Sequence, residues 1–168
     1  MIRLIGACCI VTGCGGFGFA MAAASRREEA QLRLLLGTLE FMSCELSYRH
    51  TPLPVLCRSG AGTERGAVPG FFRELAAELE KQTAPDVQTG VERVLASMDM
   101  PKGVRAILED LGTTLGRFDL PGQMRGLERA IRSTEDALGR LREGAAERRR
   151  SWQTLGLCAG AALAILFL

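Results

Sequence analysis

The spacing most like a ligand-binding signature lies near the N-terminus, in TGCGGFGF. Gly13, Gly15 and Gly18 form the pattern G-x-G-x-x-G, which lets a dinucleotide pyrophosphate approach the backbone. The complete unit needs a strand before these glycines, a helix after them, then a second strand with an acidic residue. Residues 26–41, RREEAQLRLLLGTLEF, instead indicate a helix, and no second strand follows. No Gly-Lys-Ser/Thr sequence follows either, which excludes a P-loop. The glycines therefore favour another role, a smooth face for close packing of a membrane helix.

The other side chains capable of chemistry do not form a recognisable catalytic or metal-binding set. The chain has a single histidine, His50, and no C-x-x-C pair. The six cysteines are Cys8, Cys9, Cys14, Cys44, Cys57 and Cys158. Their spacing is not that of a metal site, and free cysteines suit a reducing compartment or a membrane interior. We therefore expect no catalytic, cofactor-binding or metal-binding residues and a protein that is not an enzyme.

Charge is confined to the middle of the chain. Residues 4–24 and 151–168 have no charged side chain, whereas residues 25–150 hold all 19 acidic residues and 20 of the 21 Lys and Arg residues. A net charge of +1 in the middle is not the clustered basic face of a nucleic-acid-binding protein, so we expect no nucleic acid partner. Aromatic residues make up only 5% of the chain, which favours helices over strands and predicts an all-α fold.

The two uncharged ends predict membrane-spanning helices. A helix needs about 20 apolar residues to cross the bilayer core, which predicts spans over residues 1–24 and 151–168 around a helical domain over residues 25–150. Basic residues flank the domain at both ends: Arg26, Arg27, Arg148, Arg149 and Arg150. Because Lys and Arg collect on cytoplasmic flanks, we expect a cytoplasmic domain with both termini outside.

Three alternatives for the ends stay open. Ala22, Ala23 and Ala24 offer a site for a cleaved signal peptide, and the residues before Cys14 resemble a short lipoprotein signal. Either route would export the arginines that follow the first apolar run, against the positive-inside rule. The C-terminal run could also be a buried core helix, although it is apolar on every face and such helices normally show a polar stripe.

The domain predicts a bundle of about six helical elements, separated by proline- and glycine-rich stretches. The expected helices cover residues 25–48, 53–57, 70–83, 85–98, 101–117 and 121–150, with a glycine-rich loop over 59–70. Apolar residues at three- and four-residue steps are expected to face the core. In the first, third and last of these helices they are Leu32, Leu35, Leu36, Leu39, Met42, Leu46, Phe71, Phe72, Leu75, Leu79, Met124, Leu127, Ile131, Leu138 and Leu141.

Two further stretches are specific enough to suggest a family. They are ELSYRHTPL, residues 45–53, and LGTTLGRFDLPGQ, residues 111–123. With the apolar ends and the chain length, they resemble the stage III sporulation protein AB family of endospore-forming bacteria over the whole chain. The residues that match the two motifs are Glu45, Tyr48, Thr51, Pro52, Leu53, Gly112, Leu115, Gly116, Asp119 and Gln123.

This resemblance implies a non-catalytic platform or scaffold component of a secretion-like complex between mother cell and forespore, required for endospore formation. It implies a soluble part like the helical cytoplasmic domain of the type II secretion F protein. The implied location is the mother-cell membrane that faces the forespore. The implied partners are the secretion-type cytoplasmic ATPase of the same operon and other stage III sporulation membrane proteins. The F protein has two such domains and this chain has one, so a paired platform would require a homo-oligomer. The alternative is a membrane scaffold or regulatory protein unrelated to a secretion machine.

The second motif also has physical interpretations. Gly112 and Gly116 lie four residues apart, so on a helix they share one face, where a missing side chain lets another helix approach. Glycine lowers helix propensity by about 1 kcal/mol at each position. Asp119 precedes the last helix and is expected to be its N-cap, contributing about 1 kcal/mol.

The first motif predicts contacts at the end of the first helix. Tyr48 is expected to bury its ring while its hydroxyl finds a hydrogen-bond partner. Glu45 and Gln123 are expected to close polar contacts between the first and last helices. His50, between an arginine and Thr51-Pro52, is expected in a turn or at the surface.

The predicted topology can be tested with reporter fusions. A fusion after Arg27 should report the cytoplasm, and a fusion after Leu168 should report the outside, because the basic flanks hold the middle inside. A cytoplasmic reporter after Leu168 would show that the last apolar run does not span the membrane.

Overall fold

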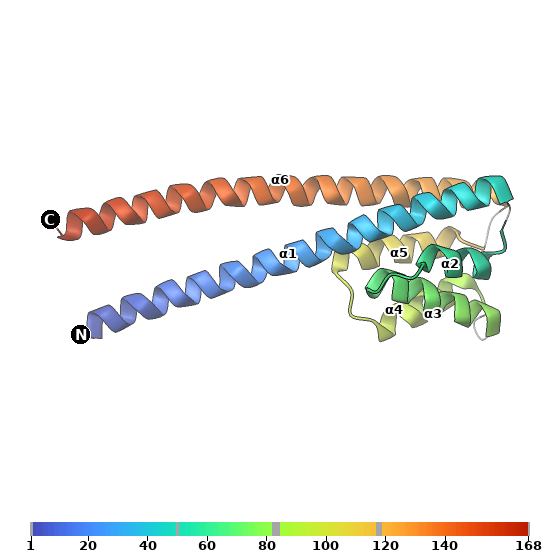
Figure 1. The fold of residues 1–168 in the computed structure, drawn as a ribbon, viewed down its shortest axis with the longest axis horizontal. Helices are drawn as coiled ribbons and strands as arrows, with labels where there is room; N and C mark the ends of the chain where they lie inside the picture. The colour runs from blue at the N-terminus through green and yellow to red at the C-terminus, as the bar shows by residue number, and fades with distance from the viewer. Residues whose placement is uncertain (1, 50, 82–84, 117–118, 168) are drawn as a thin grey trace.

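A computed structural model of the chain shows an all-α protein (Figure 1). The backbone is described for four stretches, residues 2–49, 51–81, 85–116 and 119–167. Side chains are described from residue 23 to residue 144, with the same gaps. Within these stretches there are six helices and no strand, which confirms the all-α prediction. The helices are α1 Ile2–Arg49, α2 Leu53–Ala61, α3 Ala67–Lys81, α4 Val87–Ser97, α5 Lys102–Thr114 and α6 Leu120–Phe167.

Two long helices and four short ones make up the architecture. Figure 1 shows α1 and α6 side by side, with the N- and C-termini at the same end. The short helices α2 to α5 pack against the two long helices at the opposite end. Both long helices continue through the predicted boundaries at residues 24 and 150 without a break.

The membrane-spanning prediction concerns segments whose side chains are mostly outside the described part of the chain. The predicted spans are residues 1–24 and 151–168, of which only Ala23 and Ala24 have described side chains. Among the residues the structure describes, no helix combines the length and apolar character needed to cross a membrane.

The inner face of α1 supplies one side of the core. Its apolar residues recur at three- and four-residue steps, so they lie on one stripe of the helix. Five of them are buried as predicted: Leu32, Leu35, Leu39, Met42 and Leu46. This stripe allows α1 to contact four other helices, α2, α3, α5 and α6.

Small residues let α6 approach its neighbours. Its buried line includes Ala130 and Thr134 as well as the predicted Leu127 and Leu138. The Thr134 hydroxyl is fully buried, and it donates a hydrogen bond of 2.7 Å to the carbonyl oxygen of Ala130. Three of the larger residues predicted to be inward are only half-buried: Met124, Ile131 and Leu141.

The α2–α3 connection is shorter than predicted. Residues 59–70 were expected to form a loop, but α2 extends to Ala61 and α3 begins at Ala67. The glycine content of this stretch serves packing as well as turning. A Cβ at Gly60 would lie 3.1 Å from Met42 Cγ, so a missing side chain lets α2 lie against α1. The turn itself begins at Gly62, whose φ of 53° is in the left-handed region that favours glycine.

The core also contains a buried thiol and an aromatic pair. Phe71 and Phe72 contact each other edge to face, with ring centroids 5.2 Å apart. Cys57 is fully buried, and this burial raises the pKa of its thiol to about 12. The thiol therefore stays protonated and packs as a small apolar group. Of the described cysteines, Cys44 and Cys57, neither forms a disulfide.

Two side chains of α1 hold the first turns of α3 and α5. The amide of Val68 donates to Gln31 Oε1 at 3.2 Å, and the amide of Gly103 donates to Glu28 Oε1 at 3.2 Å. The first amides of a helix have no partner within the helix, so these bonds satisfy groups that would otherwise lack one. A Cβ at Gly103 would lie 2.6 Å from Glu28 Oε1, so a side chain at this position would push the Glu28 carboxylate out of its present place.

We expect removal of either contact to destabilise the bundle. Gln31→Ala and Glu28→Ala should each lower the free energy of unfolding by about 1 kcal/mol, as for loss of a helix cap. Glu40→Ala, at an exposed position of the same helix, is the control and should change it by less than about 0.5 kcal/mol. Urea unfolding of the purified chain, followed by circular dichroism, measures the difference. Unfolding curves that superimpose on the control would show that these contacts do not contribute.

Candidate functional site

The two sequence motifs come together at the end of the bundle opposite the termini. Residues 45–53 cover the end of α1 and the start of α2, and residues 111–123 cover the end of α5 and the start of α6. Figure 1 shows both connections at the same end of the molecule. A Cβ at Gly116 would lie 3.5 Å from Leu53 Cδ2, so the two motifs adjoin directly. We call this region, residues 45–53 with 111–123, the distal end.

Glu45 closes the turn between α1 and α2. The hydroxyl of Thr51 donates to Glu45 Oε2 at 3.4 Å, and Arg49 Nη1 lies 3.6 Å from Glu45 Oε1. Pro52 then occupies the N-cap position of α2, and its carbonyl accepts the amide of Leu56 at 2.9 Å. Because the chain folds back within six residues, Thr51 reaches this carboxylate from the same segment.

The predicted polar contacts of Glu45 and Gln123 between the first and last helices stay a prediction. The carboxylate of Glu45 contacts Thr51 and Arg49 of its own segment, and a further contact joins the two long helices. The hydroxyl of Ser47 in α1 donates to the sulfur of Met124 in α6 at 3.6 Å. Gln123 is half-buried in the first turn of α6.

Tyr48 lies on the surface, contrary to the prediction that its ring is buried. Its exposed fraction is 84%. Leu46, two residues earlier, faces the core, and a two-residue step on a helix turns a side chain to the opposite side. Val55 of α2 is also an exposed large apolar residue, and Pro52 is exposed between them in sequence. We call Tyr48, Pro52 and Val55 the tip residues.

The two motif glycines both face α4, but only one lies in a helix. Gly112 is buried in α5, where a Cβ would lie 3.0 Å from Val91 Cβ. Gly116 lies beyond the end of α5, with a φ of 73°, and a Cβ there would overlap Val87. The prediction of a shared helix face is therefore wrong for Gly116, because α5 ends at Thr114. Both positions are still closely packed.

Leu115 and Asp119 set the ends of the connection from α5 to α6. Leu115 is the C-cap of α5, is 1% exposed, and donates its amide to the carbonyl of Leu111 at 3.0 Å. Asp119 Oδ1 accepts the amide of Gly122 at 3.2 Å, which is the N-cap geometry expected at the start of α6. The connection is therefore held at both ends by the chain's own groups.

The N-terminal glycine pattern lies in a continuous helix. The backbone of α1 is helical through Gly13, Gly15 and Gly18, where a dinucleotide fingerprint requires a strand and a turn. Whether these glycines form a packing face depends on side chains that the structure does not describe, and His50 also lies outside the described residues. Within the described stretches, no group of three or more His, Cys, Asp and Glu side chains could hold a metal ion.

Sequence reasoning missed three residues that adjoin the distal end. Val87 and Val91 of α4 face the two glycines, and their spacing of four equals that of Gly112 and Gly116. This matched spacing was a usable signal for a close α4–α5 contact. Val55 had no such signal, because a nine-residue helix is too short for periodicity to show which face is exposed.

Over the residues that the structure describes, the chain is an all-α protein in which two long helices and four short helices form one bundle. Its two termini leave one end, and its motifs and exposed tip residues gather at the other. The family model described as stage III sporulation protein AB matches residues 3–168, and the chain belongs to this family. The resemblance predicted from the two motifs is therefore confirmed.

A curated relative and a solved structure agree with this assignment. The chain is 25% identical to stage III sporulation protein AB of Bacillus subtilis (strain 168) over 171 residues, which covers 100% of both chains. A solved structure of a stage III sporulation protein AB aligns with a TM-score of 0.61 and 21% identity. It covers 72% of this chain and 98% of the solved chain, so the two share the fold.

Alanine substitutions at two glycines should show whether close packing or helix propensity decides the free energy of unfolding at each position. Gly112→Ala should lower the free energy of unfolding by about 1–3 kcal/mol, because the new methyl group overpacks the contact with Val91. Adding Val91→Ala should recover part of this loss. Gly139→Ala in α6, where a Cβ would meet nothing within 4 Å, is the matched control and should stabilise by about 1 kcal/mol.

Urea unfolding of the three variants measures these differences. Equal stabilisation by Gly112→Ala and Gly139→Ala would show that α4 and α5 are not closely packed at Gly112.

Proposed function

We propose that the chain is a non-catalytic platform component of a sporulation stage III secretion-like complex, and that its distal end binds a partner. The observation that supports this most directly is the position of Tyr48. It is 84% exposed, belongs to one of the two motifs on which the resemblance rests, and lies one residue before the end of α1, which Figure 1 shows opposite the termini. An exposed aromatic residue with neither a core nor a catalytic role suits a binding surface.

The arrangement of the helices supports anchoring at the opposite end. Because the two termini leave the bundle at one end, both apolar runs can enter the same membrane. The basic flanks favour a domain on the cytoplasmic side. Residues 25–49 of α1 rise about 35 Å, so the tip residues would stand about that far from the membrane surface. We infer a mother-cell membrane location on this basis and from the family.

The partner we propose for the distal end is the secretion-type cytoplasmic ATPase of the same operon. A soluble partner can reach a surface that stands clear of the membrane. The tip residues combine one aromatic side chain with smaller apolar ones, and buried aromatic residues contribute most of the binding energy at many interfaces. Other stage III membrane proteins, or a second copy of the chain, would bind nearer the membrane through the long helices.

Binding of the full-length chain to this ATPase tests the proposal. Tyr48→Ala should weaken the Kd by about tenfold or more, as for loss of an aromatic anchor. It should leave the unfolding free energy unchanged, because the ring is already in solvent. Glu135→Ala, at an exposed position of α6, is the control and should bind like the wild type.

Two outcomes would contradict different parts of the proposal. If the wild-type chain does not bind the ATPase at micromolar concentrations, the partner is wrong. If the wild type binds and Tyr48→Ala binds equally well, the tip residues are not the binding surface.

A further inference from the structure

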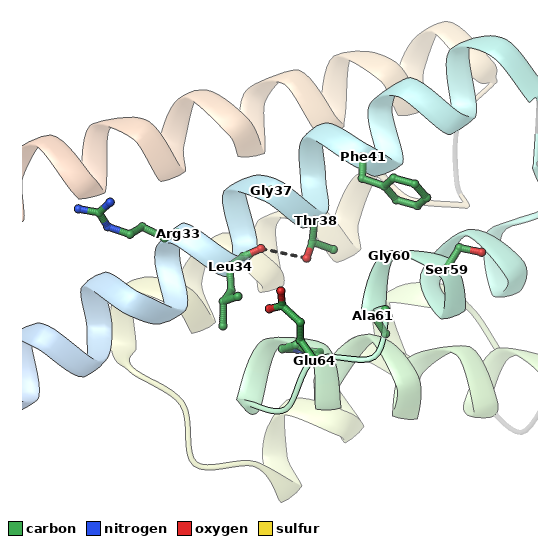
Figure 2. Close-up of a pocket in the computed structure, with 11 residues that line it drawn as sticks. Arg33, Leu34, Gly37, Thr38, Phe41, Ser59, Gly60, Ala61 and Glu64 are labelled. Atoms are coloured by element: carbon green, nitrogen blue, oxygen red, sulfur yellow. Dashed lines mark hydrogen bonds between the residues drawn. The ribbon is translucent and has the colours of Figure 1, made fainter.

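A hollow of about 350 Å³ lies between α1 and the corner where α2 passes into α3. Figure 2 shows it from the side, with α1 above and the α2–α3 corner below. It lies along α1 and is separate from the tip residues. Its lining comes from α1, the end of α2, the turn and the start of α3: Arg33, Leu34, Gly37, Thr38, Phe41, Ser59, Gly60, Ala61, Gly62, Glu64 and Pro69.

The hollow exists because its lining has few side chains to fill it. Gly37 is exposed on α1, and a Cβ there would meet nothing within 4 Å. The same holds for Gly62 on the opposite wall. Phe41 lies at one end of the hollow and remains 42% exposed, although it is a large apolar residue on a packed helix. The surface can therefore accept an apolar side chain that the chain itself does not provide.

The exposed side chain of Glu64 at the hollow has no polar partner among the described residues. Figure 2 shows the carboxylate of Glu64 pointing into the space beneath Thr38. Among the described residues this carboxylate has no hydrogen-bond or ion-pair partner. Arg73 contacts Glu64, but it donates to the main-chain oxygen, at 3.1 Å, and not to the carboxylate. Arg33 points away and binds Glu29 at 2.6 Å, and this hydrogen bond lowers the pKa of Glu29. The acid in the hollow is thus left for a basic group from outside.

We propose that this hollow receives an amphipathic helix of a partner protein, with a bulky apolar side chain over Gly37 and a Lys or Arg paired with Glu64. The lined part of α1, from Arg33 to Phe41, is about 12 Å long and matches two turns of a helix. The lining is mixed, because apolar Leu34 and Phe41 lie beside polar Thr38 and charged Glu64, and such a surface suits a helix that presents both apolar and basic side chains. The missing side chain at Gly37 leaves the space that this apolar side chain of the partner would fill. The site does not depend on the tip residues or on the ATPase.

Two variants test the proposed ion pair at Glu64 and the proposed apolar contact at Gly37. Each is expressed in a sporulating host as the only copy of this protein. Glu64→Lys places like charges together, and Gly37→Leu fills the hollow, so each should lower heat-resistant spore counts by about 100-fold or more. Glu135→Lys and Gly139→Leu make the same changes on α6 and should sporulate like the wild type. Glu64 is exposed in the turn, so Glu64→Lys tests the proposal even if Gly37→Leu lowers stability.

Suppressors of Glu64→Lys then identify the partner. The expected suppressors replace a Lys or Arg by an acidic residue in one amphipathic helix and do not rescue Gly37→Leu. A synthetic peptide of that helix should bind the wild-type full-length chain about tenfold more tightly than Glu64→Lys, and the suppressor peptide should reverse this preference. Normal sporulation of both variants, or suppressors that change no basic residue of a partner, would overturn the proposal.

Discussion

The bundle depends on the contact that α1 makes with the helices around it. Its inner stripe, from Leu32 to Leu46, is buried against α2, α3, α5 and α6, while Gln31 and Glu28 reach the first amides of α3 and α5. One helix thus supplies both the apolar surface that drives packing and the polar groups that fix where two neighbours begin. Apolar burial has no direction, so hydrogen bonds of this kind are needed to set the register between helices.

Close backbone approach then sets the geometry of the distal end. The contact of Gly112 with Val91 brings α5 against α4, and Gly116, in the left-handed region, lies beside Leu53 at the start of α2. Asp119 begins α6 immediately afterwards. The two motifs that identify the family are therefore neighbours in space because the connections at this end are short. Their conformational requirements explain most of their residues, and among the large apolar side chains described in the two motifs Tyr48 is the most exposed.

The sequence predicted the helices, the main core residues and the cap at Asp119, because each follows from spacing within one segment. It could not predict features that depend on how segments meet. Ala130 and Thr134 are buried because α1 lies close to α6, and nothing in their residue types distinguishes them from surface positions. Tyr48 has an apolar ring, yet the helix turns it outward. Gly60 was predicted in a loop from its residue type, and its close contact with Met42 inside α2 depends on how α1 and α2 meet.

The unbroken course of α1 has a geometric consequence. α1 is one continuous helix of 48 residues, and sharp bends in helices arise at proline, at glycine pairs or at interruptions of the hydrogen-bond ladder. Residues 2–49 contain no proline. The only pair of adjacent glycines in it, Gly15-Gly16, lies before the stripe and the residues that cap α3 and α5. The helix spans about 70 Å, so its N-terminal end and the distal end lie at opposite ends of a single element.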